Sequence, residues 1–416
     1  MGPVVTSTSR AIRSQLPLIF LLGVITAVDA FAIDMYIPSF PSIQADLNAD
    51  AGNMQWSLSL FLIGLGAGQA IFGPISDRYG RRGPLLLGLT LFTVASAMVA
   101  LAPSLMVFLV GRAIQGIGAS ATVVIPRAIV ADRFEARDSA KVYSMLMQIM
   151  TIGPIIAPLL GGFIIEHTVW QWVFWILFSL GLACLLFTLA VVDESLSPDR
   201  RHIESAFATF RSYGALFANR LFLFYSLTGS CVIAGLFTYV GSSAFIFTDY
   251  YQLEPGTFSY IFAGIAVGLM VLAQVNIWLL RLYSEVALLT FGLLLYLMGT
   301  CGFLVTVVFQ MATLISTTLL LFVAVASLSL IMGNLTSLAM ACVPRRAGSA
   351  SAIFGVTQYV ISGLAGVLAG MLFDGSMLPA AGILAVTGVS ACLFLLEAWR
   401  AVKTHFGSLE NRPPYR

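Results

Sequence analysis

Long apolar stretches alternate with short polar ones along almost the whole chain. A membrane-spanning helix needs about 20 predominantly apolar residues, and windows of that size can be placed here with little freedom. The pattern therefore predicts an all-α membrane protein with twelve transmembrane helices. The predicted spans, numbered 1 to 12 in chain order, are residues 15–38, 54–76, 84–103, 105–128, 142–166, 170–192, 221–247, 257–280, 286–309, 311–342, 348–373 and 378–400.

The composition excludes most other classes of protein. Hydrophobic residues make up 59% of the 416 residues, charged residues make up 10%, and the mean hydropathy is +0.95. Soluble domains carry about 25% charged residues, and disordered or disulfide-rich chains are less apolar than this one. A net charge of +2 gives no electrostatic reason to expect nucleic acid as a partner.

The Lys and Arg residues set the expected orientation, because cytoplasmic loops collect them. Of the 21 such residues, all except Arg112 and Arg127 fall on one side of the spans, together with both chain ends. We therefore expect both termini in the cytoplasm. Arg10, Arg13 and the apolar run after them resemble a signal peptide, but cleavage would remove span 1 and leave eleven. An uncleaved first helix is favoured.

The longest polar interval divides the spans into six and six. We predict an N-terminal six-helix half over residues 1–192, a central cytoplasmic loop over 193–220 and a C-terminal six-helix half over 221–416. Two pseudo-symmetric halves are typical of secondary transporters, which alternate access to a site near the midplane. The chain has no Gly-x-x-x-x-Gly-Lys-Ser/Thr loop for ATP. We therefore expect no cofactor, and an ion gradient or the solute's own gradient as the source of energy.

Ionisable residues are rare within the predicted spans, where a charge is costly and usually marks an ion or substrate pathway. Asp29 and Asp34 lie in span 1, and the core of the second half contains no acid. Five residues turn a helix by about 140°, so these two acids cannot face one seam. Asp34 is the preferred proton carrier, because Pro38 and Pro41 loosen the helix beyond it. The alternatives are a solvated interfacial position for Asp34 and a packing role for Asp29.

Arg112 lies in span 4, about seven residues from its outer end. A guanidinium there must find acceptors. One interpretation is a partner that tunes the proton affinity of a carboxylate, and the other is a structural pin on backbone carbonyls. Arg127, near the cytoplasmic end of the same span, is expected to reach toward the interface.

Two glycine-containing segments carry a specific pattern. The loop after span 2 combines glycines for close approach and a tight turn with charges that can form a breakable inner cluster. In span 5, prolines bend the helix and the flanking glycines allow a neighbour to pack closely. The loop residues are Gly73, Asp77, Arg78, Gly80, Arg81 and Arg82, and those of span 5 are Gly153, Pro154, Pro158, Gly161 and Gly162.

Aromatic residues offer candidates for an apolar substrate pocket. Tyr36, Tyr239 and Phe245 are the ones we select, although membrane proteins also place aromatic residues freely against lipid and at the interface. Three tryptophans at the outer start of span 6 fit an interfacial belt, namely Trp170, Trp172 and Trp175.

The chain resembles the major facilitator superfamily over nearly its whole length. Gly73 to Arg82 is similar to the superfamily's signature between spans 2 and 3, and Arg112 to Gly116 is similar to its span 4 motif. Gly153 to Gly162 resembles the span 5 motif of the drug/proton antiporter branch. Three segments are similar to the bicyclomycin and chloramphenicol resistance exporters (the Bcr/CflA group), namely Ala32 to Pro38, Trp172 to Leu177 and Asp193 to Leu196.

This resemblance implies proton-driven efflux of small, often neutral antibiotics across the bacterial inner membrane. It implies that Asp34 is the family's span 1 acid and that Arg112 bears on proton coupling. It also implies that Asp77 helps to lock the outward-open state against the start of span 11, near Arg345 to Ser349. An arginine of the loop between spans 2 and 3 is expected to meet Asp132 at the end of span 4.

We interpret the chain as a proton-coupled antiporter that exports small drugs or drug-like metabolites. A dedicated exporter of one endogenous solute, such as a sugar, an amino-acid derivative or a siderophore, is the alternative. The expected partners are a small-molecule substrate, protons and the lipid bilayer, with the chain acting as a monomer. A sensor or an enzyme has no support, because the three histidines lie at loop or terminal positions and no metal-ligand cluster is visible.

Overall fold

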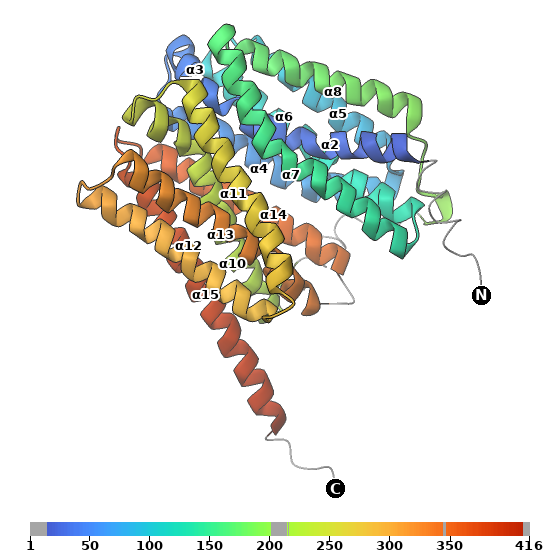
Figure 1. Cartoon of the computed structure of the whole chain (residues 1–416). Helices are drawn as coiled ribbons and strands as arrows, with labels where there is room; N and C mark the ends of the chain where they lie inside the picture. The colour runs from blue at the N-terminus through green and yellow to red at the C-terminus, as the bar shows by residue number, and fades with distance from the viewer. Residues whose placement is uncertain (1–14, 201–213, 215, 344–346, 411–416) are drawn as a thin grey trace. The chain divides into compact units, whose positions relative to one another are not determined.

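The computed structural model describes residues 15–200, 214, 216–343 and 347–410. Helices make up nearly all of these ranges (Figure 1). Twelve helical segments are long and apolar enough to cross a membrane. The prediction of an all-α protein with twelve spans is therefore confirmed.

The helices match the predicted spans in order and in number. Figure 1 shows α15 continuing as one ribbon beyond its apolar part, which ends at Ala401. In chain order the elements are α2 (Leu16–Asp34), the 3₁₀ turn η1 (Ile37–Ser39), α3 (Phe40–Leu47), α4 (Ala51–Tyr79), α5 (Arg82–Ala100), α6 (Leu105–Arg133), α7 (Ala136–His167), α8 (Gln171–Val191), the 3₁₀ turn η2 (Pro198–Arg200), α10 (Arg220–Ala244), the π-helical turn η3 (Phe245–Tyr250), α11 (Pro255–Leu279), α12 (Glu285–Val308), α13 (Leu314–Ala341), α14 (Ala347–Met371) and α15 (Leu378–Glu410).

The first span, Leu16–Leu47, extends beyond the predicted residues 15–38 and is interrupted where prolines were expected to loosen it. The α-helix α2 ends at Asp34, a 3₁₀ turn containing Pro38 follows, and α3 then continues to Leu47. Pro38 and Pro41 lack the backbone N–H that an α-helical ladder requires, so the chain changes its hydrogen bonding there. The break places Asp34 at a helix end.

The chain forms two compact units. Unit 1 comprises Met1–Ser205 and Ser243–Gly264, and unit 2 comprises Ala206–Ser242 and Ile265–Arg416. The segment Ser243–Gly264, which the division by sequence assigns to the C-terminal half, thus packs within unit 1, where η3 contacts α3. The division into two functional halves stays a prediction.

Glycines set the closest helix packing in unit 1, where α4 lies against α6 and α5 lies against α6 and α8. A methyl group at Gly116 would overlap the carbonyl oxygen of Phe61, and one at Gly64 would overlap the carbonyl oxygen of Ala113. Helices in a membrane associate largely through such close contacts. These glycines therefore fix the spacing of α4 and α6.

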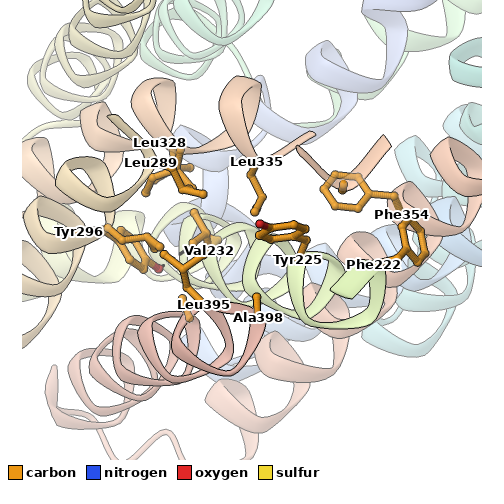
Figure 2. Packing of buried hydrophobic residues seen from close by; sticks show 14 of the residues in the cluster. Phe222, Tyr225, Val232, Leu289, Tyr296, Leu328, Leu335, Phe354, Leu395 and Ala398 are labelled. Atoms are coloured by element: carbon orange, nitrogen blue, oxygen red, sulfur yellow. Dashed lines mark hydrogen bonds between the residues drawn. The ribbon is translucent and has the colours of Figure 1, made fainter. Parts of the chain in front are cut away.

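Unit 2 is built around an apolar core that five helices share (Figure 2). Tyr296 of α12 is buried there, and its hydroxyl lies 3.0 Å from the Thr387 hydroxyl of α15. The side chains that Figure 2 labels come from α10, α12, α13, α14 and α15, namely Phe222, Tyr225, Val232, Leu289, Tyr296, Leu328, Leu335, Phe354, Leu395 and Ala398.

Replacing Gly116 with alanine should lower the thermal unfolding midpoint of the detergent-solubilised protein. Overpacking of a tight contact costs about 1–3 kcal/mol, which exceeds the gain of about 1 kcal/mol that alanine brings to a helix. Gly264→Ala is the matched control, because a methyl group there meets no described atom within 4 Å. Its midpoint should stay the same or rise. Equal midpoints for the two variants would refute the close packing of α4 on α6.

Candidate functional site

The two acids of span 1 both lie inside unit 1. The exposed fractions of Asp29 and Asp34 are 3% and 5%, so Asp34 is not a solvated residue at the interface. Within the described ranges neither acid belongs to an ion pair. The guanidinium of Arg127 on α6 lies within electrostatic range of Asp29. Which acid faces a transport cavity stays a prediction.

Arg112 is fully buried and holds the end of α2. Its Nη1 donates to the carbonyl oxygen of Ala32 at 3.1 Å and to the side-chain oxygen of Gln115. The last four carbonyls of a helix have no partner within the helix, and a cation near them interacts favourably with the helix dipole. Arg112 therefore caps α2 two residues before Asp34.

Aromatic rings surround the remaining faces of the Arg112 guanidinium. Its central carbon lies 4.1 Å from the ring centre of Tyr36, 4.5 Å from that of Phe61 and 6.0 Å from that of Phe174. Cation–π attraction at such distances strengthens when the groups are desolvated. Tyr36 also lies 3.0 Å from Ser57, hydroxyl to hydroxyl. We name Tyr36, Phe61 and Phe174 the aromatic cage.

Gln115 links this site to α5. Its side-chain nitrogen donates to the Ser96 hydroxyl at 2.8 Å, and Ser96 donates to the carbonyl of Phe92 at 2.7 Å. Gln115 is not among the functional residues predicted from the sequence. Its spacing of three residues from Arg112 places both side chains on one helix face. That spacing could have predicted the hydrogen bond between them.

These contacts match the second of the two interpretations of Arg112, a pin on a backbone carbonyl. No contact of Arg112 with a carboxylate exists among the described residues. The described contact that links Arg112 to the neighbourhood of Asp34 is its bond to the end of α2. Its part in proton coupling stays a prediction.

Trp170 corrects the expectation of a tryptophan belt. Only 2% of its surface is exposed, and its ring nitrogen donates to Asp46 at 2.8 Å. The ring packs edge-on against Phe108 and Phe174. Trp172, with 54% exposed, does fit a belt position. Trp170 instead ties α8 to α3 and extends the packing around the aromatic cage.

The charge cluster expected after span 2 forms around Arg81, between α4 and α5. Nε of Arg81 donates to Asp132 at 2.9 Å, and its Nη1 donates to Asp77 and, at 3.0 Å, to the Ser76 hydroxyl. Burial lowers the pKa of Arg81, but the hydrogen bonds to Asp132 and Asp77 outweigh that effect and raise it above its ordinary value. The structure thus brings together Asp132 and an arginine of this loop.

The other residues of that loop have separate partners. Arg78 is exposed and lies over the ring of Tyr79, and Arg82 donates to the carbonyl of Leu189 at 2.8 Å. Gly80 has a φ of +99°, which confirms the expected turn. The expected close approach at Gly73 is not seen, since a methyl group there meets no described atom within 4 Å. The expected contact of Asp77 with the start of span 11 involves Arg345 to Ser349, whose side chains lie outside the described part of the chain.

The span 5 glycines make the close contacts that the sequence predicts. Pro154 and Pro158 lie within the continuous helix α7. A methyl group at Gly153 would come within 2.9 Å of Ala30, one at Gly161 would overlap the carbonyl of Met35, and one at Gly162 would overlap the hydroxyl of Ser259. The segment thus packs against both the helix break in span 1 and the start of α11.

The three aromatic residues selected for a substrate pocket are distributed over both units. Tyr36 is buried in the aromatic cage of unit 1, Phe245 begins η3 in the same unit, and Tyr239 is buried in unit 2. A pocket that all three share stays a prediction. No group of three or more metal-ligating side chains occurs within the described ranges.

Comparison with known families and sequences identifies relatives of the chain. The family model described as Major Facilitator Superfamily matches residues 22–367. The chain is 33% identical to the "Uncharacterized MFS-type transporter YdgK" of Bacillus subtilis (strain 168), over 92% of this chain and 95% of the relative. It is 29% identical to "Multidrug resistance protein MdtL" of Escherichia coli, over 88% of this chain and 91% of the relative.

Solved structures share the fold at low sequence identity. The inward-open, partially occluded xylose transporter XylE of E. coli has a TM-score of 0.71 and 16% identity, covering 91% of this chain and 97% of that one. The nucleoside transporter NupG has a TM-score of 0.73 and 12% identity, covering 92% of this chain and 99% of that one.

Replacing Arg112 with glutamine should lower the thermal unfolding midpoint more than Arg127→Gln does. The change removes the cation from the aromatic cage and leaves buried acceptors without a donor, at about 1–3 kcal/mol for each unsatisfied group. Arg112→Lys should restore little, because a compact, strongly hydrated ammonium group cannot stack on the rings of the aromatic cage as a planar guanidinium does. The measurement is a thermal unfolding curve in one detergent. A stable Arg112→Gln protein would show that the α2 cap is dispensable.

Proposed function

Because the chain belongs to the major facilitator superfamily and is therefore a multi-pass membrane transporter rather than an enzyme, we propose that it is a proton-coupled antiporter. It exports small drugs or drug-like metabolites from the bacterial cytoplasm by alternating access. We assign it to the Bcr/CflA group of the drug/proton antiporter branch on the segments that resemble that group. Both termini lie on the cytoplasmic side.

The observation that carries proton coupling is the position of Asp34. Its carboxyl group is buried at the end of α2, takes part in no ion pair with a described residue, and follows the carbonyl that Arg112 caps. An ionisable group at membrane depth is a functional candidate by default. With Arg112 fixed to the backbone, a change in the charge of Asp34 breaks no salt bridge. The proton gradient then supplies the energy.

Two observations support export of drugs or drug-like solutes. MdtL, which aligns with most of this chain, bears the name of a multidrug resistance protein. The second half also lacks an acid in the core of its spans, as suits a neutral or lipophilic substrate. The alternative of one dedicated endogenous solute is kept, because the fold alone does not name a substrate.

Inside-out vesicles energised to be acid inside provide the test. A dye that reports the pH difference is followed while phenicols, bicyclomycin and a panel of metabolites are added. Antiport predicts that a substrate releases protons from vesicles carrying the wild-type protein. Asp34→Asn, which removes the ionisable group at nearly constant size, should abolish that release.

Asp29→Asn is the matched control on the same helix, and it should retain substrate-induced proton release. A response that survives in Asp34→Asn but disappears in Asp29→Asn would move the proton site to Asp29. A response to metabolites alone would favour the dedicated exporter. Substrate export that persists when the gradient is collapsed would overturn proton coupling.

A further inference from the structure

A four-residue segment directly after α8 binds the start of α5. We name residues 193–196 the span 6 strap. The Oε1 of Glu194 accepts the backbone N–H of Arg81 at 2.8 Å, and its Oε2 accepts that of Arg82 at 3.2 Å. Oε1 also accepts the N–H of Leu196 at 3.0 Å, which folds the strap back on itself. One carboxylate therefore joins the end of span 6 to the start of span 3.

The helix α5 needs this carboxylate because it lacks a cap of its own. Arg81, at its N-cap position, makes no side-chain capping bond, and the first N–H groups of a helix have no partner within it. An anion at that end also interacts favourably with the helix dipole. Gly80 makes room, since a methyl group there would overlap the Glu194 carboxylate. The glycine thus serves both the turn and the cap.

Buried side chains and two arginines hold the strap in place. Val192, just before it, and Leu196 at its end are 1% and 4% exposed. Arg133 donates to the carbonyl of Asp193 at 2.9 Å, and Arg82 binds Leu189 in the last turn of α8. The strap is therefore attached at several points along its length.

The strap also contacts the inner charge cluster directly. The hydroxyl of Ser195 donates to Oδ2 of Asp132 at 3.2 Å, and the same oxygen accepts Nε of Arg81 at 2.9 Å. Glu194 thus holds the backbone of Arg81 while Ser195 holds the carboxylate that Arg81 meets. Two neighbouring strap residues therefore hold the two members of the Arg81–Asp132 ion pair.

We propose that Glu194 is a positioning residue for the ion pair between Arg81 and Asp132. The proposal rests on the proposed transport function, because the charge cluster around Arg81 is expected to lock one state of the alternating-access cycle. The strap is also the first part of the central loop. A movement of α6 away from the loop after α4 must therefore break the Ser195 contact or carry the strap with it.

Backbone hydrogen exchange and a double-mutant cycle test this, on the full-length protein in lipid nanodiscs. Glu194→Gln should raise the exchange rate of the Arg81 and Arg82 amides about tenfold, as expected when a charged acceptor is lost. It should also lower the thermal unfolding midpoint. If Glu194 acts through the Arg81–Asp132 pair, at least about half of that fall should vanish in an Asp132→Asn background, because groups in one network are not additive.

Asp193→Asn is the matched control. The side chains of Asp193 and Glu194 are both exposed, but among the described residues only the backbone carbonyl of Asp193 is bonded. Asp193→Asn should change neither the exchange rate of the Arg81 and Arg82 amides nor the thermal unfolding midpoint. If the Arg81 and Arg82 amides exchange at the wild-type rate in Glu194→Gln, Glu194 does not cap α5. If the falls in midpoint caused by Glu194→Gln and Asp132→Asn simply add, Glu194 caps α5 but does not position the Arg81–Asp132 pair. If Glu194→Gln does not fold, Ser195→Ala enters the same cycle. Neither measurement uses a substrate or a gradient, so failure of the antiport assay would leave this result intact.

Discussion

A guanidinium buried among helices has to be matched by protein groups, because burial removes it from water. Nη1 of Arg112 bonds a helix end and an amide side chain, and the aromatic cage lies around the guanidinium. Nε and Nη2 have no hydrogen-bond partner among the described residues. The arrangement of the helices around Arg112 in unit 1 depends on the contacts of Nη1 and of the cage. They draw α2, α4, α6 and α8 to one point, and they fix the turn in which Asp34 lies.

The start of α5 also binds a charge that complements the helix dipole, but there the charge is negative. Arg112 places a cation at the C-terminal end of α2, and Glu194 places an anion at the N-terminal end of α5. In both cases a segment distant along the chain supplies the charge, and in both cases a residue with special backbone properties lies next to the helix end. Proline breaks the ladder after Asp34, and Gly80 adopts a left-handed φ. Charges thus connect helices where backbone hydrogen bonding stops.

The sequence predicted the features that local chemistry determines. Twelve spans, the Gly80 turn and the close contacts of the span 5 glycines follow from hydropathy and from the absence of a side chain. Hydropathy does not distinguish burial against protein from exposure to lipid, so Trp170 was assigned to a belt although it lies inside unit 1. Gln115 had a local signal in its spacing from Arg112, but the role of Glu194 depends on Arg81, which lies 113 positions away along the chain. No local pattern encodes that pair.

The attachment of Arg112 to a backbone carbonyl bears on how a single acid could couple protons to movement. A direct pair between Arg112 and Asp34 would hold the carboxylate in its charged form, and each protonation would have to break that pair. The observed cap links the two groups through the last turn of α2 and the helix break after it, and the described residues show no salt bridge between them. A change in charge at Asp34 would then act first on the conformation of that break. The same break packs against Gly161 of α7, where a methyl group would not fit. Span 5 is therefore one of the elements placed to transmit a change at Asp34 to the rest of unit 1, together with the helices that meet at the aromatic cage.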